Sequence, residues 1–84
     1  MADPVPITVY TRENCHLCDE AVETLTRIAD SEGVAIEIDE VDVDEDPDLR
    51  EEYGERVPFV LVDGTPKFKY RVDAARARSV LSRQ

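Results

Sequence analysis

Two cysteines, Cys15 and Cys18, are the only ones in this 84-residue chain, and two residues separate them. An apolar run over 7–11 precedes them and a helical pattern of apolar residues follows, so the pair stands at the start of a predicted helix. Unpaired N–H groups and the positive end of the helix dipole favour the thiolate of Cys15 there, which makes it a nucleophile. Cys18, one turn deeper, can attack a mixed disulfide formed on Cys15. The spacing predicts reversible thiol–disulfide exchange.

Other roles for the cysteine pair fit less well or remain open. A disulfide that closes so short a loop removes little entropy from the unfolded chain, so a structural role is weak. A tetrahedral zinc site needs two more ligands, and His16, between the cysteines, is the only histidine. We therefore predict no metal and no cofactor in a single chain. A zinc or iron–sulfur site bridging two chains remains an alternative, as does a redox-sensing adaptor that works without turnover.

Charge is unevenly distributed along the chain. Eighteen of the twenty acidic residues lie within 1–55, seven of the ten basic residues lie within 56–84, and the net charge is -10. This balance disfavours nucleic acid as a partner. Lysine occurs only twice against eight arginines, a pattern typical of proteins from high-salt cytoplasm, where self-repulsion is screened. The alternative is an ordinary acidic, soluble surface.

Two charged stretches have alternative interpretations. The acidic stretch 39–48, with Glu37 just before it, is interpreted as a solvated edge, because it lacks the glycine that an EF-hand calcium loop needs. The basic residues near the end of the chain either form a surface for an acidic partner or pair with the chain's own carboxylates; they are Lys67, Lys69, Arg71, Arg76 and Arg78.

The first six residues carry no basic segment or apolar run of the kind that a signal peptide has, and nothing later approaches the length of a membrane span. We therefore expect a cytoplasmic protein without a membrane partner. The length predicts one domain over 1–84, and we expect a monomer.

Hydrophobic periodicity and turn signals predict the order strand, helix, strand, helix, strand, strand, helix. Pro4 and Pro6 should stop the first strand from extending backwards, and Asn14 is the expected N-cap of the first helix. The third strand is almost continuously apolar, which is typical of an interior strand covered on both faces. The predicted ranges are 7–11, 14–31, 34–43, 47–53, 57–62, 67–72 and 74–81. A phase slip in the second strand indicates a bulge or an early end.

This order resembles the minimal thioredoxin fold, and the motifs resemble its glutaredoxin-like branch more than thioredoxin itself, since no tryptophan precedes the cysteines. The resemblance implies an α/β βαβαββα fold with a four-stranded mixed sheet flanked by three helices. The strand order would be two, one, three, four, with the third strand antiparallel to the first two. The residues that carry the resemblance are Val9-Tyr10-Thr11-Arg12 before Cys15, Asp42-Val43-Asp44, and Tyr53-Gly54-Glu55-Arg56-Val57-Pro58.

The resemblance also implies roles for the matching residues. Cys15 would attack and Cys18 would resolve, so that a protein or small-thiol disulfide is reduced and a low-molecular-weight thiol or a reductase restores the dithiol. Val57-Pro58 would form a cis bond beside Cys15, and the backbone of Val57 would pair with the substrate main chain.

Two further positions would contact substrate. Arg12 would hold a substrate carboxylate, although it is also a candidate surface partner for Glu13. Asp73 lies where the family recognises the free amino acid end of glutathione, and bare N–H groups at a helix start suit a carboxylate.

Two departures from the family pattern bear on the substrate. His16-Leu17 replaces the familiar Pro-Tyr between the cysteines; protonated His16 would favour the Cys15 thiolate, or His16 is simply an exposed intervening residue. Lys69-Tyr70-Arg71-Val72 replaces the usual Gly-Gly before the last helix, and these bulky side chains would obstruct a glutathione groove. Redox chemistry is therefore better supported than glutathione use.

Overall fold

The computed structural model describes residues 3–83, and its elements follow the predicted order with one additional 3-10 turn. The strands are β1 (Val5–Thr11), β2 (Ile36–Asp42), β3 (Phe59–Val62) and β4 (Thr65–Lys69). The helices are α1 (His16–Glu32), α2 (Pro47–Tyr53) and α3 (Ala74–Ser82), and η1 (Val43–Glu45) is the 3-10 turn.

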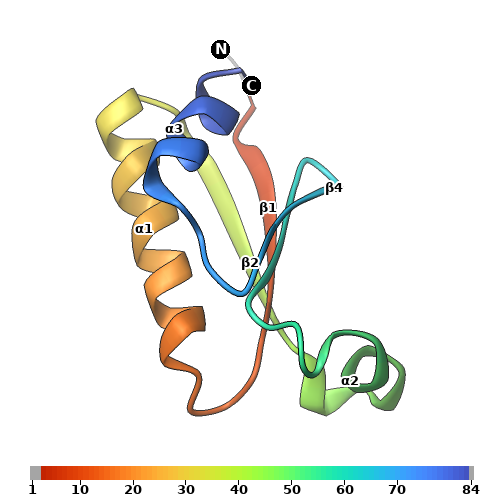
Figure 1. The fold of residues 1–84 in the computed structure, drawn as a ribbon. Helices are drawn as coiled ribbons and strands as arrows, with labels where there is room; N and C mark the ends of the chain where they lie inside the picture. Colours follow the sequence, from red (N-terminus) through yellow and green to blue (C-terminus); the bar gives the residue numbers. More distant parts are fainter. Residues whose placement is uncertain (1–2, 84) are drawn as a thin grey trace.

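The four strands form one mixed sheet in the order β2-β1-β3-β4. β1 and β2 are parallel, β3 runs antiparallel to β1, and β4 runs antiparallel to β3. This confirms the predicted fold class. Helices α1 and α3 lie side by side along one face of the sheet, whereas α2 lies near the end at which β1 leaves the sheet (Figure 1).

The core lies between the sheet and the α1–α3 pair. Alternation along β1 and β3 points one side chain in two at these helices, and burying each stabilises the fold by about 1.5–3 kcal/mol. The central members are Ile7, Val9, Val60 and Val62 from the sheet, Ala21, Leu25 and Ile28 from α1, and Ala77 and Leu81 from α3.

The opposite face of the sheet is only partly covered. Phe59 and Leu61 on β3 are half-buried, whereas Val60 and Val62 are fully buried. The predicted interior position of this strand is confirmed, but the prediction that both its faces are covered is wrong. The helix α2 has only seven residues, and its Tyr53 contacts Phe59 at the start of β3.

Several element boundaries differ from the predicted ones. β1 begins at Val5 despite Pro6, because the Pro6 carbonyl still accepts the Asp63 N–H at 2.8 Å and the Val5 N–H donates to Ala35. β2 pairs with β1 without a shift from Ile36 to Asp42; the early strand end is confirmed and a bulge in β2 is not.

The hairpin turn follows its sequence signal, since Asp63 and Gly64 both have positive φ, 52° and 81°. The bulge lies instead in the β3–β4 ladder, beside Val60 and Leu61. β4 ends at Lys69, earlier than predicted, and Tyr70 then takes a left-handed conformation with φ 70°. Within residues 3–83, no helix has the length and apolar character needed to cross a membrane.

Candidate active site

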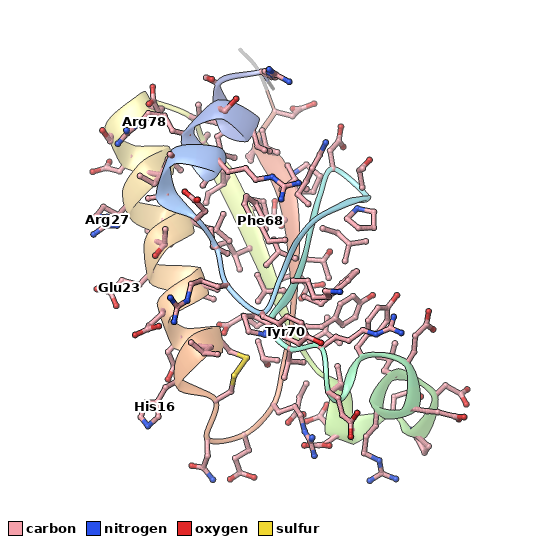
Figure 2. All side chains as sticks on the ribbon, in the orientation of Figure 1. His16, Glu23, Arg27, Phe68, Tyr70 and Arg78 are labelled. Carbon is pink, nitrogen blue, oxygen red and sulfur yellow. A yellow bond between two sulfur atoms is a disulfide. The ribbon has the colours of Figure 1, made fainter. Side chains whose placement is uncertain are left out.

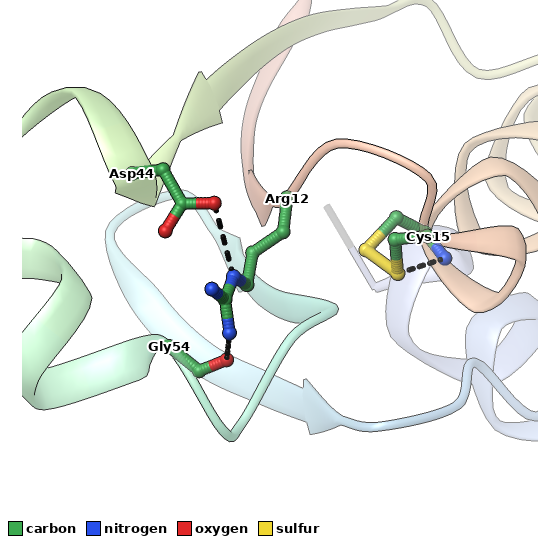
Figure 3. The surroundings of a disulfide bond; sticks show 5 residues. Arg12, Cys15, Asp44 and Gly54 are labelled. Atoms are coloured by element: carbon green, nitrogen blue, oxygen red, sulfur yellow. Dashed lines mark hydrogen bonds and ion pairs between the residues drawn. A yellow bond between two sulfur atoms is a disulfide. The ribbon is translucent and has the colours of Figure 1, made fainter.

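Cys15 and Cys18 form a disulfide at the start of α1, with their Cα atoms 5.2 Å apart. Cys15 is the N-cap residue of the helix, and its Sγ accepts the backbone N–H of Cys18 at 3.1 Å (Figure 3). A thiolate formed at this Sγ on reduction would receive the same N–H and face the positive end of a 17-residue helix. The helix start therefore favours the nucleophilic form of Cys15.

The two cysteines differ in accessibility. Cys18 is only 2 % exposed and packs within the core, whereas Cys15 is half-buried and therefore reachable. A partner sulfur can approach Cys15 but not Cys18. This geometry suits an attacking thiol at position 15 and a resolving thiol behind it.

The N-cap of α1 lies one residue later than expected, at Cys15. Asn14 is not the N-cap; it lies in the preceding loop with φ 60°, a conformation that asparagine tolerates better than most residues. The left-handed Asn14 turns the chain out of β1 so that Cys15 becomes the capping residue. The prediction that Asn14 is the N-cap was wrong, because Cys15 Sγ, rather than the side-chain oxygen of Asn14, accepts the N–H of Cys18 in the first turn.

Val57 and Pro58 lie at the same end of the sheet as the disulfide, because Tyr10 near the end of β1 pairs with Phe59 at the start of β3. The Val57–Pro58 peptide bond is cis, as the resemblance implied. Pro58 is fully buried and its carbonyl accepts the Tyr70 N–H. Among residues 3–83, neither the N–H nor the carbonyl of half-buried Val57 has a hydrogen-bond partner.

Arg12 is held by groups distant in the sequence. Its Nε donates to Asp44 Oδ2 at 3.1 Å and its Nη1 donates to the Gly54 carbonyl at 3.1 Å (Figure 3). The side chain is still 41 % exposed. The expected alternatives were a substrate anchor or a partner for Glu13; the ion pair is formed with Asp44 instead, and it ties the loop before Cys15 to the segment around α2.

His16 and Asp73 occupy different settings. His16 is the first residue of α1, adjacent to Cys15, and its side chain is exposed. Asp73 caps α3: its Oδ1 accepts the N–H groups of Ala75 at 2.8 Å and Arg76 at 3.3 Å. These two N–H groups are therefore occupied rather than bare.

A groove of about 420 Å³ joins the first turns of α1 to the segment that leads into α3. Leu17, the residue before Cys18, lines it together with Arg71 and Val72. Tyr70, which precedes Arg71, is 48 % exposed. The structure thus brings the Cys-x-x-Cys segment and the segment before Asp73 to a shared groove.

Three aromatic side chains, from β1, α2 and β3, form a cluster that the sequence analysis did not predict. Tyr10 and Tyr53 stack with ring centroids 4.4 Å apart, and Phe59 lies 4.9 Å from Tyr53. Partial burial, together with the charge of Glu52, raises the pKa of Tyr53. The aromatic character of all three positions was the only available signal, since their contacts join three different elements.

No group of three or more histidine, cysteine or acidic side chains is arranged to hold a metal ion in the described part of the chain.

The family pattern of the glutaredoxin-like domain (DUF836) matches residues 6–82. The chain belongs to this glutaredoxin-like family. The matched range contains all of the strands and helices of the structure except Val5, the first residue of β1.

Relatives agree with this assignment. An uncharacterised protein of Mycobacterium tuberculosis is 31% identical over 80 residues, which is 92% of this chain and 82% of that protein. A crystal structure of a protein from X. campestris is 35% identical with a TM-score of 0.76, covering 93% of this chain and 97% of that one. A protein of Nitrosomonas europaea is 25% identical with a TM-score of 0.77, covering 96% and 95%.

Thioredoxins share the fold at lower identity. The thioredoxin-2 of the malaria parasite is 16% identical with a TM-score of 0.63, covering all of this chain and 86% of that one. The glutaredoxin-like protein described here is therefore a thioredoxin-fold protein with a Cys-x-x-Cys disulfide at its first helix.

Proposed function

We propose that this protein is a thiol–disulfide oxidoreductase that reduces or exchanges protein or small-thiol disulfides through Cys15 and Cys18. The observation that carries the proposal is the disulfide at the start of α1, in which half-buried Cys15 accepts the Cys18 N–H while Cys18 is buried behind it. The family assignment and the thioredoxin fold support the same class of reaction.

The reaction proceeds in two exchange steps from the reduced protein. The Cys15 thiolate attacks one sulfur of the substrate disulfide, a mixed disulfide forms, and the other substrate sulfur leaves as a thiolate. The Cys18 thiol then loses its proton to solvent and attacks Cys15 Sγ, which releases the second substrate thiolate and forms the Cys15–Cys18 disulfide. The substrate gains the two electrons that the dithiol loses, and two equivalents of a small thiol, or a reductase, restore the dithiol.

Other residues of the site would contact the substrate. The N–H and carbonyl of Val57 are free to pair with a substrate main chain next to Pro58. Exposed His16 is adjacent to Cys15 at the start of α1, and Arg12 and Asp73 are further candidate contacts. We expect the protein to act in the cytoplasm as a monomer.

The deciding experiment compares single cysteine variants in a protein-disulfide reduction assay. Cys15→Ser should abolish exchange, because no accessible thiol remains. Cys18→Ser should still attack small mixed disulfides but should retain protein substrates as mixed disulfides, which mass spectrometry of the adduct detects. Full reductase activity in Cys15→Ser would refute the proposal. A metal-containing, coloured dimer of the wild-type protein would favour a bridging site, and oxidation-dependent binding with negligible turnover would favour an adaptor.

A further inference from the structure

A second groove, remote from the cysteines in sequence, follows the free edge of the sheet. It encloses about 450 Å³ and is lined by three apolar and three basic side chains. We call it the β4 groove, and its residues are Phe59, Pro66, Lys67, Phe68, Lys69 and Arg76. Both lysines of the protein are among them.

The basic side chains of the β4 groove are not neutralised by carboxylates. Among residues 3–83 the only ion pairs are Arg12–Asp44 and Arg78–Glu32. The Arg76 guanidinium lies over the Phe68 ring at 5.3 Å, and the Lys69 ammonium lies over the Tyr70 ring at 5.3 Å. Arg78 is on the same helix as Arg76 but points toward the end of α1, away from Phe68 (Figure 2).

The basic side chains divide between the two interpretations of the basic segment. Arg78 pairs with the chain's own Glu32, whereas Lys67, Lys69 and Arg76 keep their charges for an external group. The remainder of the surface is strongly acidic, with eighteen carboxylates in residues 1–55. An anionic partner is therefore repelled by most of the molecule and attracted to this groove. A polyanion as long as a nucleic acid would extend over the acidic surface.

The edge strand itself is built against strand addition. Pro66 offers no N–H, and the register shift between Val60 and Leu61 places a bulge in the ladder beside it. Proline, lysine and bulges on an edge strand all oppose pairing with an incoming strand. Recognition at this groove must therefore use side chains: carboxylates on the basic residues and an apolar group on Phe59 and Pro66.

We propose that the β4 groove is a docking site for an acidic segment of a partner polypeptide in which an apolar side chain is flanked by carboxylates. The carboxylates contact Lys67, Lys69 and Arg76, and the apolar side chain contacts Phe59 and Pro66; Phe68, which is 5% exposed, supports Arg76 from the core side. The site does not require the cysteines to be reactive, so it stands or falls independently of the proposed oxidoreductase activity.

The test uses the full-length, oxidised protein and a short blocked peptide with acidic residues on both sides of one phenylalanine. A second peptide carries the corresponding amides in place of the carboxylates. Titrations followed by NMR should shift the resonances of residues 65–69 and 76 with the acidic peptide only. Lys67→Gln/Lys69→Gln should weaken Kd roughly three- to tenfold, as expected for the loss of two exposed charge pairs.

The matched control is Arg27→Gln/Arg78→Gln, which removes the same net charge outside the β4 groove and should change Kd less than about twofold. Thermal unfolding checks that all variants fold. Equal weakening in both double variants, equal binding of the amide peptide, or shifts confined to other surfaces would overturn the proposal. So would tighter binding of a single-stranded oligonucleotide at this groove, or a dimer that Lys67→Gln/Lys69→Gln dissociates, since the occupant would then be nucleic acid or a second copy.

Discussion

Cys15 combines three properties that its neighbours lack. It caps α1, it is half-buried rather than enclosed, and it follows a residue with a left-handed backbone. Cys18 shares the disulfide but not the access. At the scale of single residues, the asymmetry of the pair therefore comes from their positions on one helix turn, since the two side chains are chemically identical.

Arg12 offers a test of structural against substrate-binding roles. Arg12→Ala removes the bonds to Asp44 and the Gly54 carbonyl, so we expect a loss of about 1–2 kcal/mol in the free energy of unfolding. If Arg12 also holds a substrate carboxylate, KM should rise for an anionic disulfide but not for a neutral one. Asp44→Asn is the control: it removes the ion pair, leaves the guanidinium, and should not raise that KM. A KM increase for both substrates in Arg12→Ala would assign Arg12 a positioning role only.

His16 is expected to have a small electrostatic influence. Its side chain is exposed beside Cys15, where solvent and salt screen charge–charge interactions. His16→Ala should therefore move the midpoint of the Cys15 thiolate titration by less than about half a pH unit at moderate salt. Thiolate absorbance measured in the Cys18→Ser background gives this midpoint directly. A larger upward move would show that protonated His16 stabilises the thiolate.

The segment between β4 and α3 is the element that we expect to obstruct glutathione. Tyr70 holds φ 70°, which a glycine would adopt without steric cost. Tyr70 thus combines a backbone conformation that favours glycine with a large, exposed side chain. Arg71 and Val72 then line the groove beside Leu17.

Substitutions at Tyr70 separate backbone strain from side-chain obstruction. Tyr70→Gly should be more stable than Tyr70→Ala by about 1 kcal/mol in urea unfolding, because alanine keeps the left-handed penalty. Both variants remove the ring, so both should be reduced faster by glutathione than the wild type. Unchanged reduction rates in both would mean that the ring does not obstruct the groove.

At the scale of the whole molecule, the main feature is an excess of negative charge that is unevenly distributed over the surface. The net charge is -10, and β2, at one edge of the sheet, carries acidic side chains. The other edge carries both lysines. With two ion pairs within residues 3–83, most carboxylates in the described chain lack a direct cationic partner and repel one another.

Salt should therefore stabilise this protein. The Debye length falls from about 10 Å at 0.1 M to about 3 Å at 1 M salt, which suppresses the repulsion between neighbouring carboxylates. We expect Tm to rise between low and molar salt. Asp39→Asn/Glu40→Gln, which removes two charges from the β2 edge, should raise Tm at low salt and flatten the dependence. A Tm that does not change with salt would contradict a high-salt adaptation.

The sequence by itself determined the features that depend on nearby residues. Element order follows from hydrophobic periodicity, the Asp63-Gly64 turn from two residues that tolerate positive φ, and the caps at Asp46 and Asp73 from short polar side chains before a helix. The position of the Cys-x-x-Cys motif at the start of a helix was also predicted from nearby residues. Each of these is a local interaction, so its signal lies within a few positions of the chain.

Only the tertiary structure decided which charges are neutralised and which faces are covered. Arg12 forms an ion pair with Asp44, 32 residues away in the sequence. Arg78 forms an ion pair with Glu32, whereas Arg76, two residues earlier, has no ion pair and lies over the Phe68 ring. A short α2 leaves one face of β3 half-exposed. These outcomes depend on which elements lie next to each other in space, and neither composition nor periodicity determines the distances between side chains on different elements.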